Sequence, residues 1–239
     1  MNTLKIDRKH TLMIAHRGLC GIEPENTSFA FVAAGNRSYF GIETDVHCTA
    51  DGDFVLTHDD NAKRVSGVDC MIESTDFATL RKLALFDKEG FADREAIRMP
   101  TLEEYVRICK RYEKVCVLEL KNHMSEVDVR RIIDRIEAED YLPSVIFISF
   151  DFENLVYVRR YRPAQRVQFL FEAFTEDILI RIREHRFDVD VYYKALTEEL
   201  VNLLHAEGIA VNCWTVNRPE IAERLISWGV DYITTNILE

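Results

Sequence analysis

The sequence contains no long apolar stretch. Its first residues, MNTLKIDRKHTLMIAHRG, lack the continuous hydrophobic run of a signal peptide, and no later window approaches the roughly 20 apolar residues of a membrane-spanning helix. We therefore expect a cytoplasmic protein that makes no stable insertion into a membrane.

Positive charge is also in short supply. Lysine and arginine number 30 against 41 aspartates and glutamates, which gives a formal net charge of -11. Nucleic acids and anionic membranes favour basic surfaces, so we expect neither as a partner. A small anionic ligand would need local positive charge or a bound metal.

Cysteine pairs are absent too. The six cysteines occur without a CxxC pair, and most lie in apolar runs such as KVCVLEL and VNCWTV. We interpret them as reduced packing residues and not as a disulfide framework or a zinc site.

The chain of 239 residues does contain a regular alternation of strand and helix patterns. Eight runs rich in β-branched and aromatic residues are expected strands: 11–16, 41–48, 114–120, 144–150, 166–171, 189–193, 209–216 and 231–236. Helix-period stretches alternate with them: 25–35, 101–112, 125–140, 151–162, 175–186, 197–208 and 218–229. Eight such units favour an α/β fold, a closed (β/α)₈ TIM barrel, although a doubly wound open sheet would give a similar alternation.

Residues 59–100 break this alternation, because they exceed the usual few-residue connection between a strand and the next helix. The segment is mixed in polarity and contains one expected short helix. We therefore predict a single barrel domain over residues 1–239, with a small insertion after the second strand, an inserted subdomain at about 59–100. Insertions at this end of a barrel usually lie over the active site and shape substrate access.

Carboxylates recur at one position of neighbouring strands. Glu43 and Asp45 lie two apart in GIETDVHC, so both side chains point to the same face of a strand. Glu119 and Lys121 repeat this spacing in VLELK on the next strand. An isolated pair of this kind is usually exposed at a strand edge, but three carboxylates inside a barrel suit a hard cation such as Mg²⁺ or Ca²⁺. Lys121 could then neutralise a phosphate.

Two histidines follow expected strands. His16 follows the first strand directly, and His58 follows the run Phe54, Val55 and Leu56, which we interpret as extending the second strand. A lone histidine is most often a surface or core residue, but barrel enzymes gather catalytic groups at the carboxyl ends of strands. Two imidazoles beside a phosphate suit acid-base chemistry, and Arg17 adds a guanidinium fork. His47 is ambiguous, since it could share the face of the carboxylates.

With these residues in this order, the chain resembles the glycerophosphodiester phosphodiesterases. The resemblance runs in order from residue 14 to the C-terminus through six motifs: IAHRG (14–18), PENT (24–27), GIETDVHCTADGDFVLTHDD (41–60), PTLEE (100–104), LELK (118–121) and NCWTVN (212–217). A chance HRG would be weak evidence, whereas this series is specific.

The resemblance implies a (β/α)₈ barrel that hydrolyses glycerophosphodiesters to sn-glycerol 3-phosphate and an alcohol. It implies a divalent metal, Mg²⁺ or Ca²⁺ with Mn²⁺ as a third option, and a glycerol hydroxyl that attacks phosphorus to give a cyclic phosphate. Carried over by motif, the roles are metal ligation by Glu43, Asp45 and Glu119, acid-base catalysis by His16 and His58, and phosphate binding by Arg17 and Lys121. Which histidine is the base stays open.

Three further residues have both a functional and a structural interpretation. Glu25 and Asn26 of PENT are expected to support the site, while Asn26 or Thr27 could instead cap the following helix. Trp214, by resemblance, lines the pocket over the glycerol, although a tryptophan on an apolar strand more often packs in the core.

Two alternative functions remain. A lysophospholipase D-like barrel enzyme could use the same groups, and a large exposed apolar rim would favour it. A catalytically silent phosphate-binding barrel is expected to have lost a histidine or a carboxylate, and this sequence retains them. The leaving-group alcohol and the oligomeric state are not readable from the sequence.

Overall fold

The computed structural model of the chain describes residues 2–92 and 97–239. Met1 and residues 93–96 lie outside the described residues. Both belong to the predicted domain, and residues 93–96 also belong to the predicted insertion.

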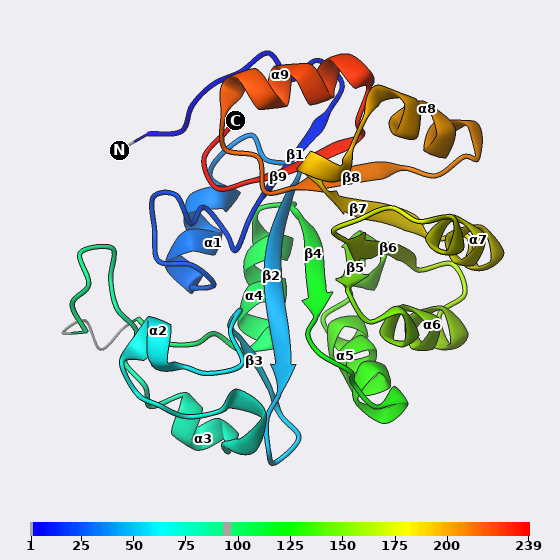
Figure 1. Cartoon of the computed structure of the whole chain (residues 1–239). Coiled ribbons are helices and arrows are strands. Elements are labelled where there is room, and N and C mark those ends of the chain that lie inside the picture. Colours follow the sequence, from blue (N-terminus) through cyan, green and yellow to red (C-terminus); the bar gives the residue numbers. More distant parts are fainter. Residues whose placement is uncertain (1, 93–96) are drawn as a thin grey trace.

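Eight parallel strands form a closed barrel, which confirms the predicted fold (Figure 1). The ring closes because β1 pairs with β2 on one side and with β9 on the other. The barrel strands are β1 (Leu12–Ala15), β2 (Gly41–Cys48), β4 (Val115–Leu120), β5 (Val145–Ser149), β6 (Arg166–Phe171), β7 (Asp188–Tyr192), β8 (Val211–Trp214) and β9 (Tyr232–Thr235). Each of the eight predicted strands therefore corresponds to one strand of the barrel.

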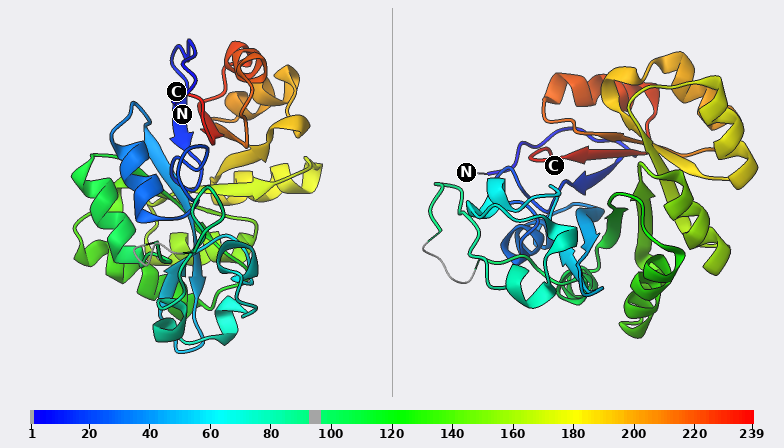
Figure 2. Two further views of the ribbon diagram at one scale, coloured as in Figure 1. Left: turned by 90° about the vertical axis from the view of Figure 1, so that its left-hand side faces the viewer. Right: turned by 60° about the horizontal axis from the view of Figure 1, so that its bottom comes forward.

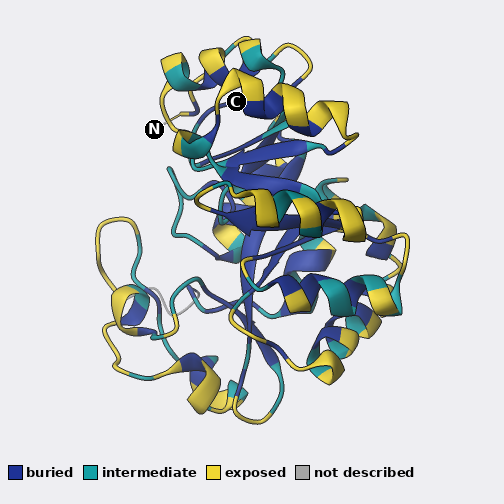
Figure 3. Cartoon of the chain, turned by 45° about the vertical axis from the view of Figure 1, so that its right-hand side comes forward, coloured by how far each residue is buried: buried dark blue, intermediate teal, exposed yellow. Residues whose placement is uncertain are grey.

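Helices connect successive barrel strands and turn their exposed faces outwards (Figure 3). They are α1 (Ser28–Gly35), α4 (Leu102–Arg111), α5 (Glu126–Ala138), α6 (Phe152–Tyr161), α7 (Glu176–His185), α8 (Glu198–Ala206) and α9 (Pro219–Trp228). Thr101 begins α4 with a reciprocal capping box to Glu104, and Ser125 and Thr197 cap α5 and α8. Short 3₁₀ turns are η2 (Leu142–Ser144) and η3 (Tyr193–Ala195).

One prediction about the second strand is wrong. The run Phe54–Leu56 does not extend β2 but forms a separate strand, β3 (Phe54–Leu56), antiparallel to the end of β2. The chain reverses at Thr49–Asp53, where Gly52 has a φ of 78° that favours glycine. The antiparallel strand returns the chain to the barrel mouth, where the backbone N–H of Thr57 donates to the carbonyl of Asp45.

The segment after β3 has a small core of its own. It contains α2 (Lys63–Ser66), η1 (Ile72–Ser74) and α3 (Phe77–Leu80), and it lies to one side of the barrel in Figure 1 and in the right-hand view of Figure 2. Its buried apolar residues form one cluster: Val55, Ala62, Ile72, Leu80, Leu85, Ile97 and Met99. Only Val55 of this cluster belongs to β3, so the segment packs on the hairpin.

The barrel interior changes character along its axis. Inward-facing Ile14, Val117 and Ile146 form an apolar cluster inside the barrel, with Ile148 and Leu170. The next inward residues toward the carboxyl ends of β1, β2 and β4 are polar, namely His16, Asp45 and Glu119. The apolar layer thus supports a polar mouth. Among the described residues, no helix is long and apolar enough to cross a membrane.

Candidate active site

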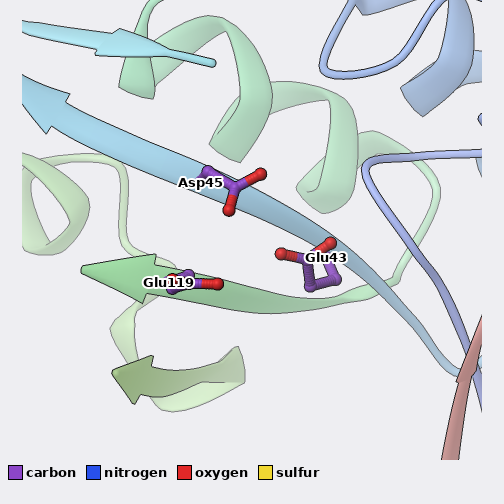
Figure 4. A group of neighbouring side chains, drawn as sticks. All are labelled: Glu43, Asp45 and Glu119. Carbon is purple, nitrogen blue, oxygen red and sulfur yellow. The ribbon is translucent and has the colours of Figure 1, made fainter. Parts of the chain in front are cut away.

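Three buried carboxylates meet at the carboxyl ends of β2 and β4. Glu43 and Asp45 project from β2 and Glu119 from β4, as Figure 4 shows. Each side chain offers an oxygen within 4.8 Å of the others, and none of the three residues is more than 8% exposed. The register explains the meeting, because Asp45 lies opposite Glu119 in the parallel pair. An exposed strand-edge pair is therefore excluded for Glu43 and Asp45.

Burial and the crowding of like charges raise the pKa values of two of these carboxyls, Glu43 and Glu119. Burial, followed by the negative charges of Asp45 and Glu119, raises the pKa of Glu43 well above its ordinary value. Burial and the charge of Asp45 raise the pKa of Glu119 to about 7. An all-oxygen set of buried carboxylates that repel one another fits a hard divalent cation, which would favour their ionised forms.

Two basic side chains face the same carboxylates. The Lys121 ammonium lies 2.8 Å from Glu119 Oε1 and 3.5 Å from Asp45 Oδ1. Arg17 donates its backbone N–H to Glu43 Oε2 at 2.7 Å, and its Nε lies 3.7 Å from Asp45 Oδ2. Burial raises the pKa of Asp45, but Lys121 and Arg17 outweigh it, so the net pKa is lowered.

The backbone around Arg17 is shaped for this contact. Arg17 has a φ of 50° and Gly18 a φ of 72°. A Cβ at Gly18 would meet Ala30 of α1 at 2.7 Å, so a side chain there would push the helix away. Arg17 Nε is buried and has no hydrogen-bond partner among the described residues. The turn therefore places a guanidinium N–H at the mouth, beside Asp45, where its hydrogen-bonding capacity is unused within the described residues.

His16 is held by an amide. Its Nδ1 lies 2.7 Å from Oδ1 of Asn236, an acceptor, so Nδ1 carries the proton and Nε2 has a lone pair. Burial, and then the charge of Arg17, lowers the pKa of His16 to about 4. The imidazole is therefore neutral at pH 7.

His58 is held by a carboxylate. Its Nδ1 lies 2.8 Å from Asp59 Oδ1, and Arg64 of α2 donates to both oxygens of Asp59, at 2.6 and 3.0 Å. Arg64 also donates to both oxygens of Glu25, which in turn accepts from Arg17 at 2.9 Å. These hydrogen bonds hold the pKa of Asp59 well below its ordinary range. Arg64 thus joins the segment after β3 to the partners of two site residues.

The predicted supporting residues have distinct positions. Asn26 donates to Asp45 Oδ2 at 2.8 Å and accepts from Thr44 at 2.7 Å, which fixes the orientation of its amide. Thr27, not Asn26, caps α1, since it accepts from the N–H of Ala30. His47 is fully buried, with Nδ1 3.1 Å from Glu73 and Nε2 3.4 Å from the carbonyl of His58. His47 therefore contacts the backbone of His58 and no carboxylate of the cluster.

A cavity of about 80 Å³ lies between these groups. Its walls comprise His16, Arg17, Glu43, His58, Glu119, Ile148, Phe150, Leu170, Asp190, Trp214, Thr215 and Thr234. Trp214 packs edge-to-face with Phe150, with centroids 5.6 Å apart, and lines the cavity. A larger hollow of about 750 Å³ lies around Leu142 and Gln165, and none of the candidate residues lines it.

Four residues of the mouth were given no role from the sequence: Asp59, Arg64, Asp190 and Asn236. Asp59 adjoins His58 in the HDD motif, so its position was a usable signal. Asn236 follows the last strand as His16 follows the first, and β1 and β9 are neighbours only once the barrel is closed. Arg64 and Asp190 lie in patterns that are common on surfaces and strands, and nothing in the sequence singles them out.

Comparison with known proteins identifies relatives along the whole chain. Residues 16–239 match the model of the glycerophosphoryl diester phosphodiesterase family. A glycerophosphodiester phosphodiesterase of Caldanaerobacter subterraneus subsp. tengcongensis is 30% identical over 231 residues, which cover 95% of this chain and 94% of that protein.

Solved structures agree with this match. A glycerophosphodiester phosphodiesterase from Parabacteroides distasonis has a TM-score of 0.81 and 27% identity, covering 95% of this chain and 93% of that one. A phosphodiesterase from Oleispira antarctica in complex with the product sn-glycerol-3-phosphate has the same fold, with a TM-score of 0.88 at 24% identity over 97% and 95% of the two chains.

Proposed function

The chain belongs to the glycerophosphoryl diester phosphodiesterase family, and from this premise we propose that it hydrolyses glycerophosphodiesters to sn-glycerol 3-phosphate and an alcohol. The enzyme class, a phosphodiesterase acting on glycerophosphodiesters, follows from the family. The observation that supports the proposed reaction best is the buried carboxylate cluster at a barrel mouth between two histidines and two basic side chains.

The proposed metal ligands are Glu43, Asp45 and Glu119. Their buried, mutually repelling oxygens fit a hard divalent cation, either Mg²⁺ or Ca²⁺, with Mn²⁺ as the third candidate. A cation bound there supplies Lewis-acid stabilisation of the negative charge that develops on the phosphate and on the attacking hydroxyl. All three side chains come from β2 and β4 and lie together, and Glu43 and Glu119 line the cavity.

The proposed phosphate anchors are Arg17 and Lys121. The buried Nε–H of Arg17 makes no hydrogen bond to the described residues and contacts Asp45 at the longer ion-pair distance of 3.7 Å, so a phosphate oxygen would satisfy it without breaking an existing hydrogen bond. Lys121 contacts Asp45 and Glu119 and can hold a phosphate beside them as a compact charge. Both cations therefore lie where a dianionic transition state needs them.

The partners of the two histidines support different roles. Asn236 is a neutral acceptor that leaves His16 unprotonated at Nε2, so we assign His16 as the general base for the attacking hydroxyl. Burial lowers the pKa of His58, but Asp45 and Asp59 oppose this shift and stabilise an imidazolium, which the neutral Asn236 does not do for His16. We therefore assign His58 as the general acid for the leaving oxygen. His58 then donates from Nε2 while Nδ1 stays bonded to Asp59.

The aromatic side chains Phe150 and Trp214 at the cavity indicate whether the alternative substrate, a lysophospholipid, would fit. Phe150 is 47% exposed and lies on the cavity wall beside Trp214. Of the exposed large apolar side chains that the described residues contain, Phe150 is the one that lines this cavity. A single exposed ring makes a smaller rim than a fatty acyl chain needs, so this site favours water-soluble diesters.

A substrate panel tests the proposed function. We expect release of glycerol 3-phosphate from glycerophosphocholine and glycerophosphoethanolamine with Mg²⁺, Ca²⁺ or Mn²⁺, slower turnover of lysophosphatidylcholine, and no turnover in EDTA. Metal-independent turnover would contradict the three-carboxylate ligand set. Binding of glycerol 3-phosphate without turnover of any diester would indicate the silent phosphate-binding barrel instead.

A further inference from the structure

Asp190 is a buried acid that the proposed chemistry leaves without a role. It lies on β7, which is four strands away from β2 around the eight-stranded ring, and so stands across the barrel from Glu43 and Asp45. Its side chain lines the cavity and is 1% exposed. It therefore faces the candidate site from the wall opposite the ligand strand.

One carboxyl oxygen of Asp190 is unpartnered within the part of the chain that the structure describes. Its Oδ1 is buried and accepts no hydrogen bond from the described residues. The backbone carbonyl of the same residue accepts from Trp214 Nε1 at 3.3 Å, which fixes the strand against the cavity wall. The main chain of Asp190 is thus held in place, while its side-chain oxygen remains available to accept a hydrogen bond from a ligand.

Polar neighbours do not supply the missing donor. Asn212 lies beside Asp190 in register, yet its Nδ2 donates to Gln168 at 3.1 Å and its Oδ1 accepts from Thr234 at 3.3 Å. These side chains satisfy one another and leave Asp190 out. A buried polar atom without a partner destabilises the folded state, and such atoms are retained chiefly where function uses them.

The surroundings of Asp190 indicate what would bind it. The basic groups lie on the β1 and β4 side, so a phosphate belongs there. The carboxyl of Asp190, which already feels the charge of Glu119, would repel a phosphate. Ile148, Leu170 and Trp214 add apolar surface to the same cavity. A short carbon skeleton that carries a hydroxyl matches both the apolar walls and the unpartnered oxygen of Asp190. Its carbons would contact the walls, and its hydroxyl would donate to the carboxyl.

We propose that Asp190 is a specificity-determining residue that accepts a hydrogen bond from the terminal hydroxyl of the substrate's glycerol moiety. This inference rests on the proposed function. The glycerol moiety has two free hydroxyls. In the proposed reaction the hydroxyl next to the ester is the nucleophile and lies by the carboxylates, so the terminal hydroxyl is the one available to Asp190. A carboxyl oxygen can accept this hydrogen bond whether or not the group is ionised.

Paired substrates measure the contact directly. Glycerophosphocholine is compared with its terminal-deoxy analogue, the phosphocholine diester of propane-1,2-diol, which retains the hydroxyl next to the ester. We expect the wild-type enzyme to prefer glycerophosphocholine by roughly 10- to 100-fold in kcat/KM, the loss usual when a buried polar group is left unpaired. Asp190→Val should reduce this preference to roughly threefold or less, and Asp190→Asn, which keeps an acceptor, should lie between.

A matched variant on the same strand separates recognition from folding. Asp188 lies two residues earlier on the same face of β7, further from the mouth, and accepts from the backbone N–H of Ala210 at 2.9 Å. Asp188→Val should lower the melting temperature and keep the substrate preference. Asp190→Val should keep or raise the melting temperature, because it removes an unpartnered buried acid, while it loses the preference.

Product binding gives a readout without turnover. By titration calorimetry, Asp190→Val should bind sn-glycerol 3-phosphate roughly 10-fold more weakly than wild type and inorganic phosphate with unchanged affinity. An unchanged preference in Asp190→Val, or a melting temperature lowered more than in Asp188→Val, would overturn the inference. If Asp190→Val does not fold, an unchanged preference in Asp190→Asn together with an unchanged affinity for sn-glycerol 3-phosphate overturns it. Failure of the wild-type enzyme on both substrates would overturn the proposed function itself.

Discussion

The crowded carboxylates make the metal-free protein sensitive to pH. Glu119 has an ordinary pKa of 4.5 that burial and Asp45 raise to about 7. The native protein therefore holds a proton on this group at pH values where the unfolded chain has released it. The stabilising contribution is complete below about pH 4.5 and disappears as the pH rises through about 7.

The size of this effect follows from the difference between the two pKa values. Because one pKa unit corresponds to about 1.4 kcal/mol, Glu119 accounts for a loss of about 3 kcal/mol in the free energy of unfolding between pH 4.5 and pH 8. For a domain of this size about 1 kcal/mol lowers the melting temperature by about 2–4 °C, so the expected fall is about 6–12 °C. Glu43, whose pKa is also raised, adds to the fall, whereas the lowered pKa of Asp45 acts only in more acidic solution.

Thermal unfolding in EDTA measures the effect. Melting temperatures of wild type, Glu119→Gln and Glu184→Gln are recorded at half-unit steps between pH 5 and pH 8, where Glu184 is an exposed residue of α7 that serves as the control. The difference between wild type and Glu119→Gln should shift by about 3 kcal/mol across this range, whereas Glu184→Gln should parallel wild type. Parallel curves for wild type and Glu119→Gln would refute the reasoning.

Adding the cation should offset most of this loss of stability at high pH. Binding to ionised carboxylates competes with protons, so the stabilisation by Ca²⁺ or Mg²⁺ should grow with pH. At a concentration one hundred times the dissociation constant it amounts to about 2.7 kcal/mol. A melting temperature that does not respond to either cation at pH 8 would count against the ligand set.

Three further predictions concern the groups around the carboxylates. His16→Ala and His58→Ala should each retain the fold and lose about 10² to 10⁴ in kcat, measured on glycerophosphocholine, and wild-type rates would remove that histidine from the mechanism. Asn236→Asp places an anion on His16, raises its pKa from about 4, and should move the acidic limb of the kcat/KM profile to higher pH; an unmoved limb would contradict the base assignment. Arg64→Ala releases Asp59 and Glu25 and should lower kcat by about 10-fold or more with a loss of about 1–2 kcal/mol in stability, while Arg64→Lys keeps one contact and should fall between; chemical denaturation and steady-state rates check both.

The barrel and its carboxylates could be predicted from the sequence because each depends on a local period. Alternation along GIETDVHC and VLELK fixes which side chains face inward, and the parallel pairing of β2 with β4 then brings Asp45 and Glu119 together. N-caps such as Thr101 are equally local, since a side chain three residues away completes them.

The remainder of the mouth depends on contacts between distant segments. The interpretation of Phe54–Leu56 as part of the second strand was wrong, because an apolar run does not reveal a reversal of direction and the turn signal at Gly52 went unused. Arg64 reaches Glu25 across 39 positions, and Asn236 reaches His16 across 220. No spacing rule relates residues so far apart, and the side chain of Asp190 makes no hydrogen bond to the described residues from which its position could have been predicted.

The antiparallel hairpin of β2 and β3 has an evolutionary consequence. In a barrel of this type the loops can usually vary independently, because each one begins and ends on the scaffold. Here His58 is placed by a hairpin on which the following segment packs, and Arg64 of that segment holds the carboxylate beside it. Substitutions in this segment would therefore also act on the proposed proton donor, so any change of substrate range made there would be coupled to a change in turnover.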